Sequence, residues 1–381
     1  MRIAWISSWP PRTCGIAAYS QELVKAIREL GHKVYVICHT DGGRPGEKYI
    51  YPILNTAEPD WDEKLYQKIK LIKPDLIHIQ HEYGLYISDN DYATHLLRPL
   101  CRWKIEREFP VVVTYHSIYP RLDVKRATYM DVTLRLISAG VVHESFQKTY
   151  LPENIGWVPS NVYVIPHGAK MPKSYSKEKA KIRLGIAGKK VVGLIGLFAP
   201  TKGYHRVIGA WDSLVEKLPS NTILILAGDT PIHSDYGPKY KEQLLKLVDS
   251  IKAKDKIKLI LGKFTLEEYE QILSTFDLIV LPYTFGSQSG NLARAFSLGI
   301  PAVVSGLDSL RTQIELSKGG IAVPLKDNES LKRAIVTMMN NDELRRKCSE
   351  RAREYVATKI GWPIIARKHL ELYKSLRIKK N

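Results

Sequence analysis

The sequence has few cysteines, and none of them lies close to another. The four residues Cys14, Cys38, Cys101 and Cys348 never form a CxxC pair, which argues against both a zinc knuckle and a disulfide framework. The sequence also lacks any apolar run near the roughly 20 residues that a membrane-spanning helix needs. Its first residues run directly into a strand-like segment, without the apolar stretch of a secretory signal. We therefore expect a cytoplasmic chain that does not cross a bilayer.

Two further patterns are absent or weak, and each excludes a kind of chemistry. The GxGxxG fingerprint is missing, which disfavours an NAD-dependent oxidoreductase. Asp89 with Asp91, and Asp60 with Asp62, have the spacing of carboxylates that hold a divalent metal. Both pairs stand in polar loops next to helix starts, where capping is the better interpretation. We therefore expect neither a metal site nor a bound cofactor.

Positive charge, in contrast, is abundant: 57 Lys and Arg face 39 Asp and Glu, for a formal net charge of +18. Such a charge attracts nucleotide phosphates, anionic lipid or nucleic acid. Nucleic acid is not expected as a partner, because no basic run is interleaved with periodic aromatic residues. The basic stretches 98–107 and 121–135 also carry apolar residues. They predict either peripheral contact with an anionic membrane, on its inner face, or a solvated basic face.

A repeated pattern of short apolar runs and helical segments covers the chain. Runs rich in Val and Ile, followed by helical periodicity, are typical of buried parallel strands joined by crossover helices. The expected strands are 3–6, 34–38, 76–80, 111–116, 140–143 and 162–166, then 191–196, 222–228, 257–262, 278–283, 301–306 and 320–324. Helices are expected at 19–30, 203–218, 236–251 and 292–298. The fold class is therefore α/β, with two facing Rossmann-like domains.

The domain boundaries follow from the breaks in this pattern. A length of 381 residues favours about two domains. Pro166, Pro172 and a Lys- and Ser-rich stretch interrupt the apolar periodicity. We expect a first domain at 1–170, a linker at 171–190, a second domain at 191–357 and a closing helix at 358–381, with Pro363 near its first turn.

In the first half, several polar residues directly follow strands. Ligands of open parallel sheets bind beyond the carboxyl ends of the strands, so these residues are candidates for a site. Arg12 and Gly15 lie in a turn before a helix, whose N-terminus can accept an anion. The third strand is followed by His81, Glu82 and Tyr83. This cluster either binds a ligand hydroxyl or forms a structural hydrogen-bond network. His116 follows the fourth strand and is either catalytic or structural.

In the second half, two loops suit phosphate chemistry. Lys202 and Gly203 stand between a strand and a helix, which places an ammonium group beside a helix N-terminus. The second loop has small and polar residues, which let the backbone approach a ligand and donate hydrogen bonds to it. It consists of Ser287, Gln288, Ser289, Gly290 and Asn291. Its alternative role is that of an ordinary helix N-cap.

The order of these motifs resembles the family-4 glycosyltransferases of the GT-B fold, which are retaining enzymes that use nucleotide-sugar donors. The resemblance covers nearly the whole chain. It rests on the loop around Gly15, the cluster at 80–84, residues 114–116, the segment 164–168, Lys202 with Gly203, the loop 288–290 with the following 299–301, and the closing helix with Trp362 and Tyr373. Each motif is weak alone, but their order and spacing make the set specific.

The resemblance implies a division of labour. The first half holds the acceptor, with Arg12, His81, Glu82 and Tyr83 as its candidate contacts; the second half holds the donor; and the last helix crosses back onto the first half. Lys202 falls where family members contact the donor diphosphate, and His116 where a histidine faces the transferred sugar. Gly15 falls in the loop that approaches the donor phosphate. The nucleoside is expected beside Asp229, Gly262, Lys263 and Phe264.

Two departures from the family pattern concern the donor. Many members have two glutamates eight positions apart, where this chain has Gly286 and Arg294, and many have an arginine where Leu197 stands. Some members carry a similar Gln-Ser-Gly loop. The best interpretation is transfer of a hexosyl unit, with retention, from a UDP- or GDP-sugar to a hydroxyl of a glycan, a lipid-linked sugar or a small polar acceptor. The alternatives are a nucleotide-sugar epimerase of the same fold and a non-catalytic nucleotide-sugar-binding subunit.

Overall fold

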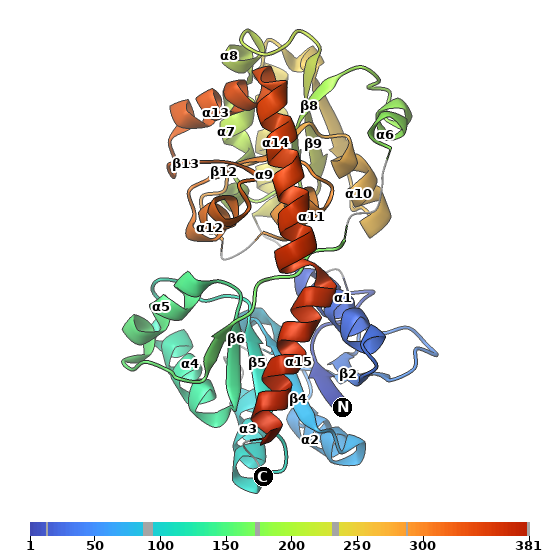
Figure 1. The fold of residues 1–381 in the computed structure, drawn as a ribbon, viewed down its shortest axis with the longest axis vertical. Helices are drawn as coiled ribbons and strands as arrows, with labels where there is room; N and C mark the ends of the chain where they lie inside the picture. Colours follow the sequence, from blue (N-terminus) through green and yellow to red (C-terminus); the bar gives the residue numbers. More distant parts are fainter. Residues whose placement is uncertain (13, 87–93, 172–175, 231–235, 287–288, 379–381) are drawn as a thin grey trace. The chain divides into compact units, whose positions relative to one another are not determined.

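The computed structural model describes residues 1–12, 14–86, 94–171, 176–230, 236–286 and 289–378. Asp89, Asp91, Ser287 and Gln288 therefore lie outside the described residues. The chain divides into two compact units, Met1–Gly168 with Ile360–Asn381, and Ala169–Lys359 (Figure 1). Each unit has its own parallel sheet and its own hydrophobic core.

The described residues of the first unit form a seven-stranded parallel sheet with the order β3-β2-β1-β4-β5-β6-β7. The strands are β1 (Arg2–Ile6), β2 (Lys33–His39), β3 (Ile50–Leu54), β4 (Leu76–His81), β5 (Val111–Tyr115), β6 (Ala139–Val142) and β7 (Val162–Val164). The expected strands are present, and β3 is an addition that the sequence analysis missed. It contains Pro52 and lies at the sheet edge, where a proline without an N–H is tolerated.

The helices of the first unit include one from the far end of the chain. They are α1 (Gly15–Glu29), α2 (Trp61–Ile72), η1 (Tyr83–Leu85), α3 (Thr94–Glu106), α4 (Val124–Leu136), α5 (Ser145–Ile155) and α15 (Trp362–Ile378). Figure 1 shows α15 beside α1 along one face of the sheet. Ile365, Ala366 and Tyr373 of α15 are buried in one cluster with Trp5 and Leu23. The predicted return of the last helix to the first half is confirmed.

Across the described residues of the second unit, six parallel strands have the order β10-β9-β8-β11-β12-β13. They are β8 (Lys190–Ile195), β9 (Thr222–Gly228), β10 (Ile257–Leu261), β11 (Leu278–Leu281), β12 (Ala302–Ser305) and β13 (Gly320–Val323). All six match expected strands. Together the two sheets confirm the α/β prediction of two Rossmann-like domains.

The helical segments of the second unit differ from the expectation in two places. They are α6 (Lys177–Arg183), η2 (Pro200–Lys202), α7 (Tyr204–Gly209), α8 (Trp211–Val215), α9 (Gly237–Ser250), η3 (Lys254–Lys256), α10 (Leu266–Ser274), α11 (Gly290–Ser297), α12 (Asp308–Ser317), α13 (Asn328–Asn340), α14 (Asp342–Tyr355) and the π-helical turn η4 (Val356–Ile360). The helix expected at 203–218 is interrupted at Ala210, directly after Gly209, a residue with poor helix propensity. Helix α6 lies inside the stretch that we expected to be a linker.

Parallel strands place the loops that follow them on one edge of each sheet. In the first unit this edge receives the residues after β1, β4 and β5, and in the second unit those after β8, β9, β10 and β11. Most of the candidate residues stand on these two edges. Within the described residues, no helix is long and apolar enough to cross a membrane.

Candidate active site

His116 lies at the end of a buried chain of polar groups in the first unit. It directly follows β5, and its Nε2–H donates to Gln80 Oε1 on β4 at 2.9 Å. The amide nitrogen of Gln80 donates to His78 Nε2 at 3.1 Å, and His78 Nδ1 is hydrogen-bonded to the hydroxyl of Tyr373 on α15. The proton positions are assigned from this network. The chain of bonds connects the candidate histidine to the helix that returns from the C-terminal end.

An aromatic cluster surrounds the His116 ring. Tyr19 of α1 has its ring centroid 4.9 Å from that of His116 and 5.0 Å from that of His167, and His143 lies 5.1 Å from His116. Burial lowers the pKa of His116 well below its ordinary value, and the neighbouring His143 and His167 lower it further. His116 is therefore a neutral imidazole near pH 7, suited to a hydrogen bond with a polar ligand group rather than to an ion pair.

His81, the last residue of β4, and the following Glu82 and Tyr83 lie together but face different surroundings. The carboxylate of Glu82 accepts hydrogen bonds from Ser117 Oγ and, at 3.1 Å, from the Tyr83 backbone N–H. Burial raises the pKa of Glu82. His81 is 1% exposed, its ring is stacked 5.1 Å from that of Tyr129, and burial lowers its pKa to about 3. Its ring therefore faces the aromatic core, so the position favours the structural alternative for this histidine.

Arg12 and Gly15, the two candidate residues that follow β1, have different surroundings. Arg12 Nη1 pairs with Asp41 Oδ1 at 3.2 Å. Gly15 is the first residue of α1, and a Cβ built on it meets no atom within 4 Å among the described residues. Its N-cap residue, Cys14, makes no side-chain cap bond. Within the described part of the chain, no capping side chain therefore covers the amide groups of this helix start.

Lys202 is the clearest cationic candidate in the second unit. It ends the short turn η2 after β8, and its Nζ lies 3.9 Å from the ring centroid of Tyr283, which follows β11. Among the described residues no carboxylate pairs with this ammonium. Gly203 has φ +67, and a Cβ there would overlap the carbonyl oxygen of Pro282, so only glycine fits. The tight turn holds a cation at the carboxyl edge of the sheet, and no acidic residue of the described part of the chain neutralises it.

The described part of the donor loop, Ser289 to Asn291, is anchored to the protein. Ser289 Oγ accepts from the Leu292 N–H at 3.3 Å and is the N-cap of α11. Asn291 Nδ2 donates to Ile195 O at 2.8 Å and to the Tyr283 hydroxyl at 3.2 Å. These side chains fix the start of α11 against β8. Among the described residues, the Leu292 and Ala293 N–H groups are bonded to Ser289, so the N–H groups of Gly290 and Asn291 are those that remain for a ligand here.

The remaining candidates stand at the ends of β9 and β10. Asp229 Oδ1 accepts from Lys241 Nζ at 2.7 Å and from the Thr230 N–H at 2.8 Å, and these hydrogen bonds lower its pKa. Gly262 and Lys263 follow β10, and Phe264 lines a hollow of about 440 Å³ beside α6 and α10. Asp229 is thus already charge-compensated, while Phe264 is available as an apolar wall.

The structure also shows polar contacts of three basic residues that the sequence analysis did not select as site residues. Arg294, which stands where many family members have a glutamate, lies 3.7 Å from Glu270, and Lys170 lies 3.3 Å from the same carboxylate. Arg206 is buried and donates to Pro282 O at 3.1 Å and to Ser305 Oγ at 3.2 Å. No local sequence signal marks these pairs, because the partners lie far apart along the chain.

The described residues contain no group of three or more His, Cys, Asp or Glu side chains arranged to hold a metal ion. Asp60 occupies the N-cap position of α2 and pairs with Lys64 at 3.2 Å, and Asp62 is buried and pairs with Arg98 at 3.0 Å. The second pair, Asp89 and Asp91, lies outside the described residues.

Two Rossmann-like halves, each with a parallel sheet, define the class of the protein by its fold, which is the GT-B fold. More specifically, residues 13–170 match the family model "Glycosyltransferase Family 4" and residues 176–355 match "Glycosyl transferases group 1". The chain therefore consists of a glycosyltransferase family 4-like domain followed by a group 1 glycosyl transferase domain.

Similar proteins agree with this assignment. The chain is 25% identical over 223 residues to a D-inositol 3-phosphate glycosyltransferase of Corynebacterium urealyticum, an alignment that covers 57% of this chain and only 52% of that protein. It is 24% identical to a phosphatidyl-myo-inositol mannosyltransferase of Mycobacterium leprae, over 76% of this chain and 75% of that protein. The crystal structure of Anabaena HepE in complex with UDP matches with a TM-score of 0.78 and 18% identity, over 98% of this chain and 100% of HepE.

Proposed function

We propose that the protein transfers a hexosyl unit from a nucleoside diphosphate sugar to a hydroxyl acceptor, with retention of anomeric configuration. The observation that carries the proposal is Lys202, an ammonium group without a carboxylate partner among the described residues, held at a strand end by a turn that only glycine can complete. A leaving diphosphate gains negative charge as the glycosidic bond breaks. A fixed cation stabilises that charge more in the transition state than in the ground state.

The donor is proposed to be a UDP- or GDP-sugar bound by the second unit. Lys202 and the N-terminus of α11 contact the diphosphate, and the ends of β9 and β10, with Phe264, receive the nucleoside. HepE, which has the same fold, was crystallised with UDP-glucose. Because the sequence has Gly286 and Arg294 where many family members have two glutamates, we propose that the chain belongs to the subgroup whose Gln-Ser-Gly loop replaces them. Its ribose contacts must then come from other groups.

The first unit is proposed to hold the acceptor and to orient the transferred sugar. His116 is neutral and its ring is oriented by the hydrogen bond to Gln80, and its proposed role is to face the transferred sugar. Arg12, Glu82 and Tyr83 remain the proposed acceptor contacts. Relatives with inositol-containing names make a polyol acceptor the first class to assay. No metal is required in this scheme, because Lys202 and helix N–H groups neutralise the diphosphate.

The test is product analysis with a panel of UDP- and GDP-sugars, with and without polyol, glycan and lipid-linked acceptors, in the presence of EDTA. We expect an acceptor-dependent glycoside and free nucleoside diphosphate, both unaffected by EDTA. Epimerised donor without acceptor indicates the epimerase alternative instead. Nucleotide binding without turnover across the panel indicates a binding subunit, an alternative that the absence of the two glutamates at Gly286 and Arg294 favours. Activity that EDTA abolishes and magnesium restores contradicts the metal-free mechanism.

Peripheral contact with an anionic membrane is proposed for the first unit. The apolar residues Leu100 and Trp103 of α3 are buried in the core, whereas Ile105 is 79% exposed. Arg98 pairs with Asp62, and Arg135 with Asp131. Part of the basic charge is therefore compensated within the protein. Equal sedimentation with anionic and neutral vesicles at low salt contradicts this contact.

A further inference from the structure

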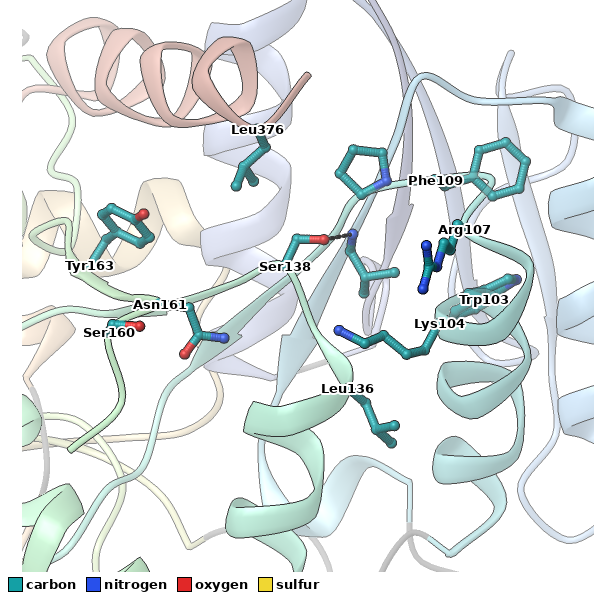
Figure 2. A pocket seen from close by; sticks show the side chains of 12 residues that line it. Trp103, Lys104, Arg107, Phe109, Leu136, Ser138, Ser160, Asn161, Tyr163 and Leu376 are labelled. Carbon is teal, nitrogen blue, oxygen red and sulfur yellow. Dashed lines mark hydrogen bonds between the residues drawn. The ribbon is translucent and has the colours of Figure 1, made fainter. Parts of the chain in front are cut away.

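A second hollow opens on the first unit, at the sheet edge opposite to His116. It has a volume of about 460 Å³ and lies where β5, β6 and β7 begin, beside the ends of α3, α4 and α15 (Figure 2). Val111, the first residue of β5, borders it, whereas His116 follows the last residue of that strand. Five residues of strand separate the two places by about 16 Å. The hollow is therefore not part of the candidate active site.

The walls of this hollow are held in place by hydrogen bonds. Asn161 Nδ2 donates to Leu134 O at 3.0 Å and to Ile137 O at 3.3 Å. These bonds give partners to two backbone carbonyls at the C-terminal end of α4. Ser138 Oγ accepts from the Val111 N–H at 3.1 Å. Apolar side chains complete the wall: Trp103, Phe109, Leu136 and Leu376. The cavity is thus largely formed before any ligand arrives, which lowers the ordering cost of binding.

The charge on this hollow is positive and uncompensated. Lys104 and Arg107 line the hollow, and Figure 2 shows both side chains among those around the cavity. Neither cation has an ion pair or a side-chain hydrogen bond among the described residues, and no carboxylate belongs to the lining. The nearby cations differ: Lys70 pairs with Glu108 at 2.6 Å, and Arg377 pairs with Asp75 at 3.3 Å.

We propose that this hollow binds a phosphate monoester that carries an apolar or aromatic group. A phosphate monoester has a charge of about −1.5 to −2 at pH 7 and three acceptor oxygens, which matches two cations in one cavity. The volume exceeds that of a single phosphate group, and the apolar wall accommodates the attached group. A soluble phosphate monoester and the headgroup of phosphatidate share this chemistry, and binding of either is independent of the transfer reaction.

The first arm of the test uses phenyl phosphate as the probe and the full chain as the receptor. Calorimetric titration at low salt is carried out on the parent, on Lys104→Ala/Arg107→Ala and on the control Lys25→Ala/Lys148→Ala. The control removes the same charge from α1 and α5 and leaves Lys202 intact. We expect saturable binding to the parent and to the control, and at least tenfold weaker binding to the variant of the hollow. All three proteins are expected to melt alike, since the four side chains are exposed.

The second arm distinguishes the source of the ligand. Co-sedimentation with phosphatidate-containing vesicles is measured for the same three proteins, with neutral vesicles as the reference. Loss of vesicle binding in the hollow variant alone assigns the site to a lipid headgroup, and loss of phenyl phosphate binding without a change in sedimentation assigns it to a soluble ester. If neither probe distinguishes the hollow variant from the charge-matched control, the site does not exist. None of these outcomes depends on transferase activity.

Discussion

At the scale of single residues, Lys202 is the side chain whose removal should most reduce nucleotide binding and turnover. Lys202→Met removes the ammonium and keeps an apolar stem against Tyr283. We expect nucleoside diphosphate binding to weaken by about tenfold or more and turnover to fall with it. The reason is that the ammonium group is proposed to contact the diphosphate in both the ground state and the transition state. Calorimetry and steady-state kinetics measure the two effects. Lys246→Met on α9 is the control; binding by Lys202→Met at the parental affinity contradicts the assignment.

His116 should separate binding from chemistry. In the proposed mechanism it orients the transferred sugar and does not touch the diphosphate, so His116→Ala should bind free nucleoside diphosphate like the parent. Turnover should fall on the order of 10², as for the loss of one well-placed polar group in a water-poor site. The comparison requires equal melting temperatures, because a buried histidine also supports its neighbours. Parental turnover in a folded variant removes His116 from the mechanism.

Gln80 should control which nitrogen of His116 carries the proton. Its amide oxygen accepts from His116 Nε2, so the parent should show the Nε2–H tautomer and a His116 pKa well below its ordinary value, since burial lowers that pKa. Gln80→Glu places a carboxylate beside the ring and should raise that pKa. Nuclear magnetic resonance of ¹⁵N-labelled imidazole groups reads both properties directly, with His116→Ala to assign the signal. A parent protonated at Nδ1 is the result that overturns this role.

At the scale of elements, the turn before α7 should depend on its glycine. Gly203→Ala introduces a Cβ at φ +67 against the Pro282 carbonyl, which should cost on the order of 1–3 kcal/mol and displace Lys202. Gly209→Ala is the matched control, because its Cβ meets nothing within 4 Å and alanine favours the helix. Denaturant unfolding and nucleotide titration measure both variants. Equal stability of the two variants contradicts the steric argument.

Elements and site residues were predictable where a pattern marks them within one continuous stretch of the sequence. Buried parallel strands are continuous apolar runs, so nearly all were found, whereas β3 contains Pro52, is half-exposed and lacks that signal. Lys202 could be selected as a candidate because a strand, a glycine and a helix surround it in sequence, and its role stays a prediction. The bonds from His116 through Gln80 to Tyr373 were not predictable. They join β5, β4 and α15 only after the sheet and the last helix have assembled.

At the scale of the whole molecule, the two units should differ in their resistance to acid. The first unit buries His39, His78, His81, His116, His143 and His369. Burial lowers the pKa of each; it falls to about 3 for His143 and about 4 for His369. Because the folded pKa values lie below the unfolded value of about 6.5, this stability is complete above pH 6.5 and is lost as the pH falls below it.

We therefore expect the first unit to open before the second on acidification. Each such histidine lowers the free energy of unfolding by about 1.4 kcal/mol per pH unit within this window. Hydrogen exchange at pH 7 and pH 5, corrected for the intrinsic rate and resolved by peptide, measures both units in one sample, so the second unit is the internal reference. Uniform loss of protection in both units is the contrary result.

The return of α15 to the first unit has a consequence for synthesis. A ribosome delivers the chain from its amino end, so residues 1–168 emerge long before the helix that completes their core. The second unit is continuous and is able to fold while translation continues. Until α15 leaves the exit tunnel, Trp5, Tyr19 and Leu23 lack the side chains that cover them in the finished protein, and this apolar surface is available to chaperones. The first unit, although it is synthesised first, is thus expected to complete its folding last.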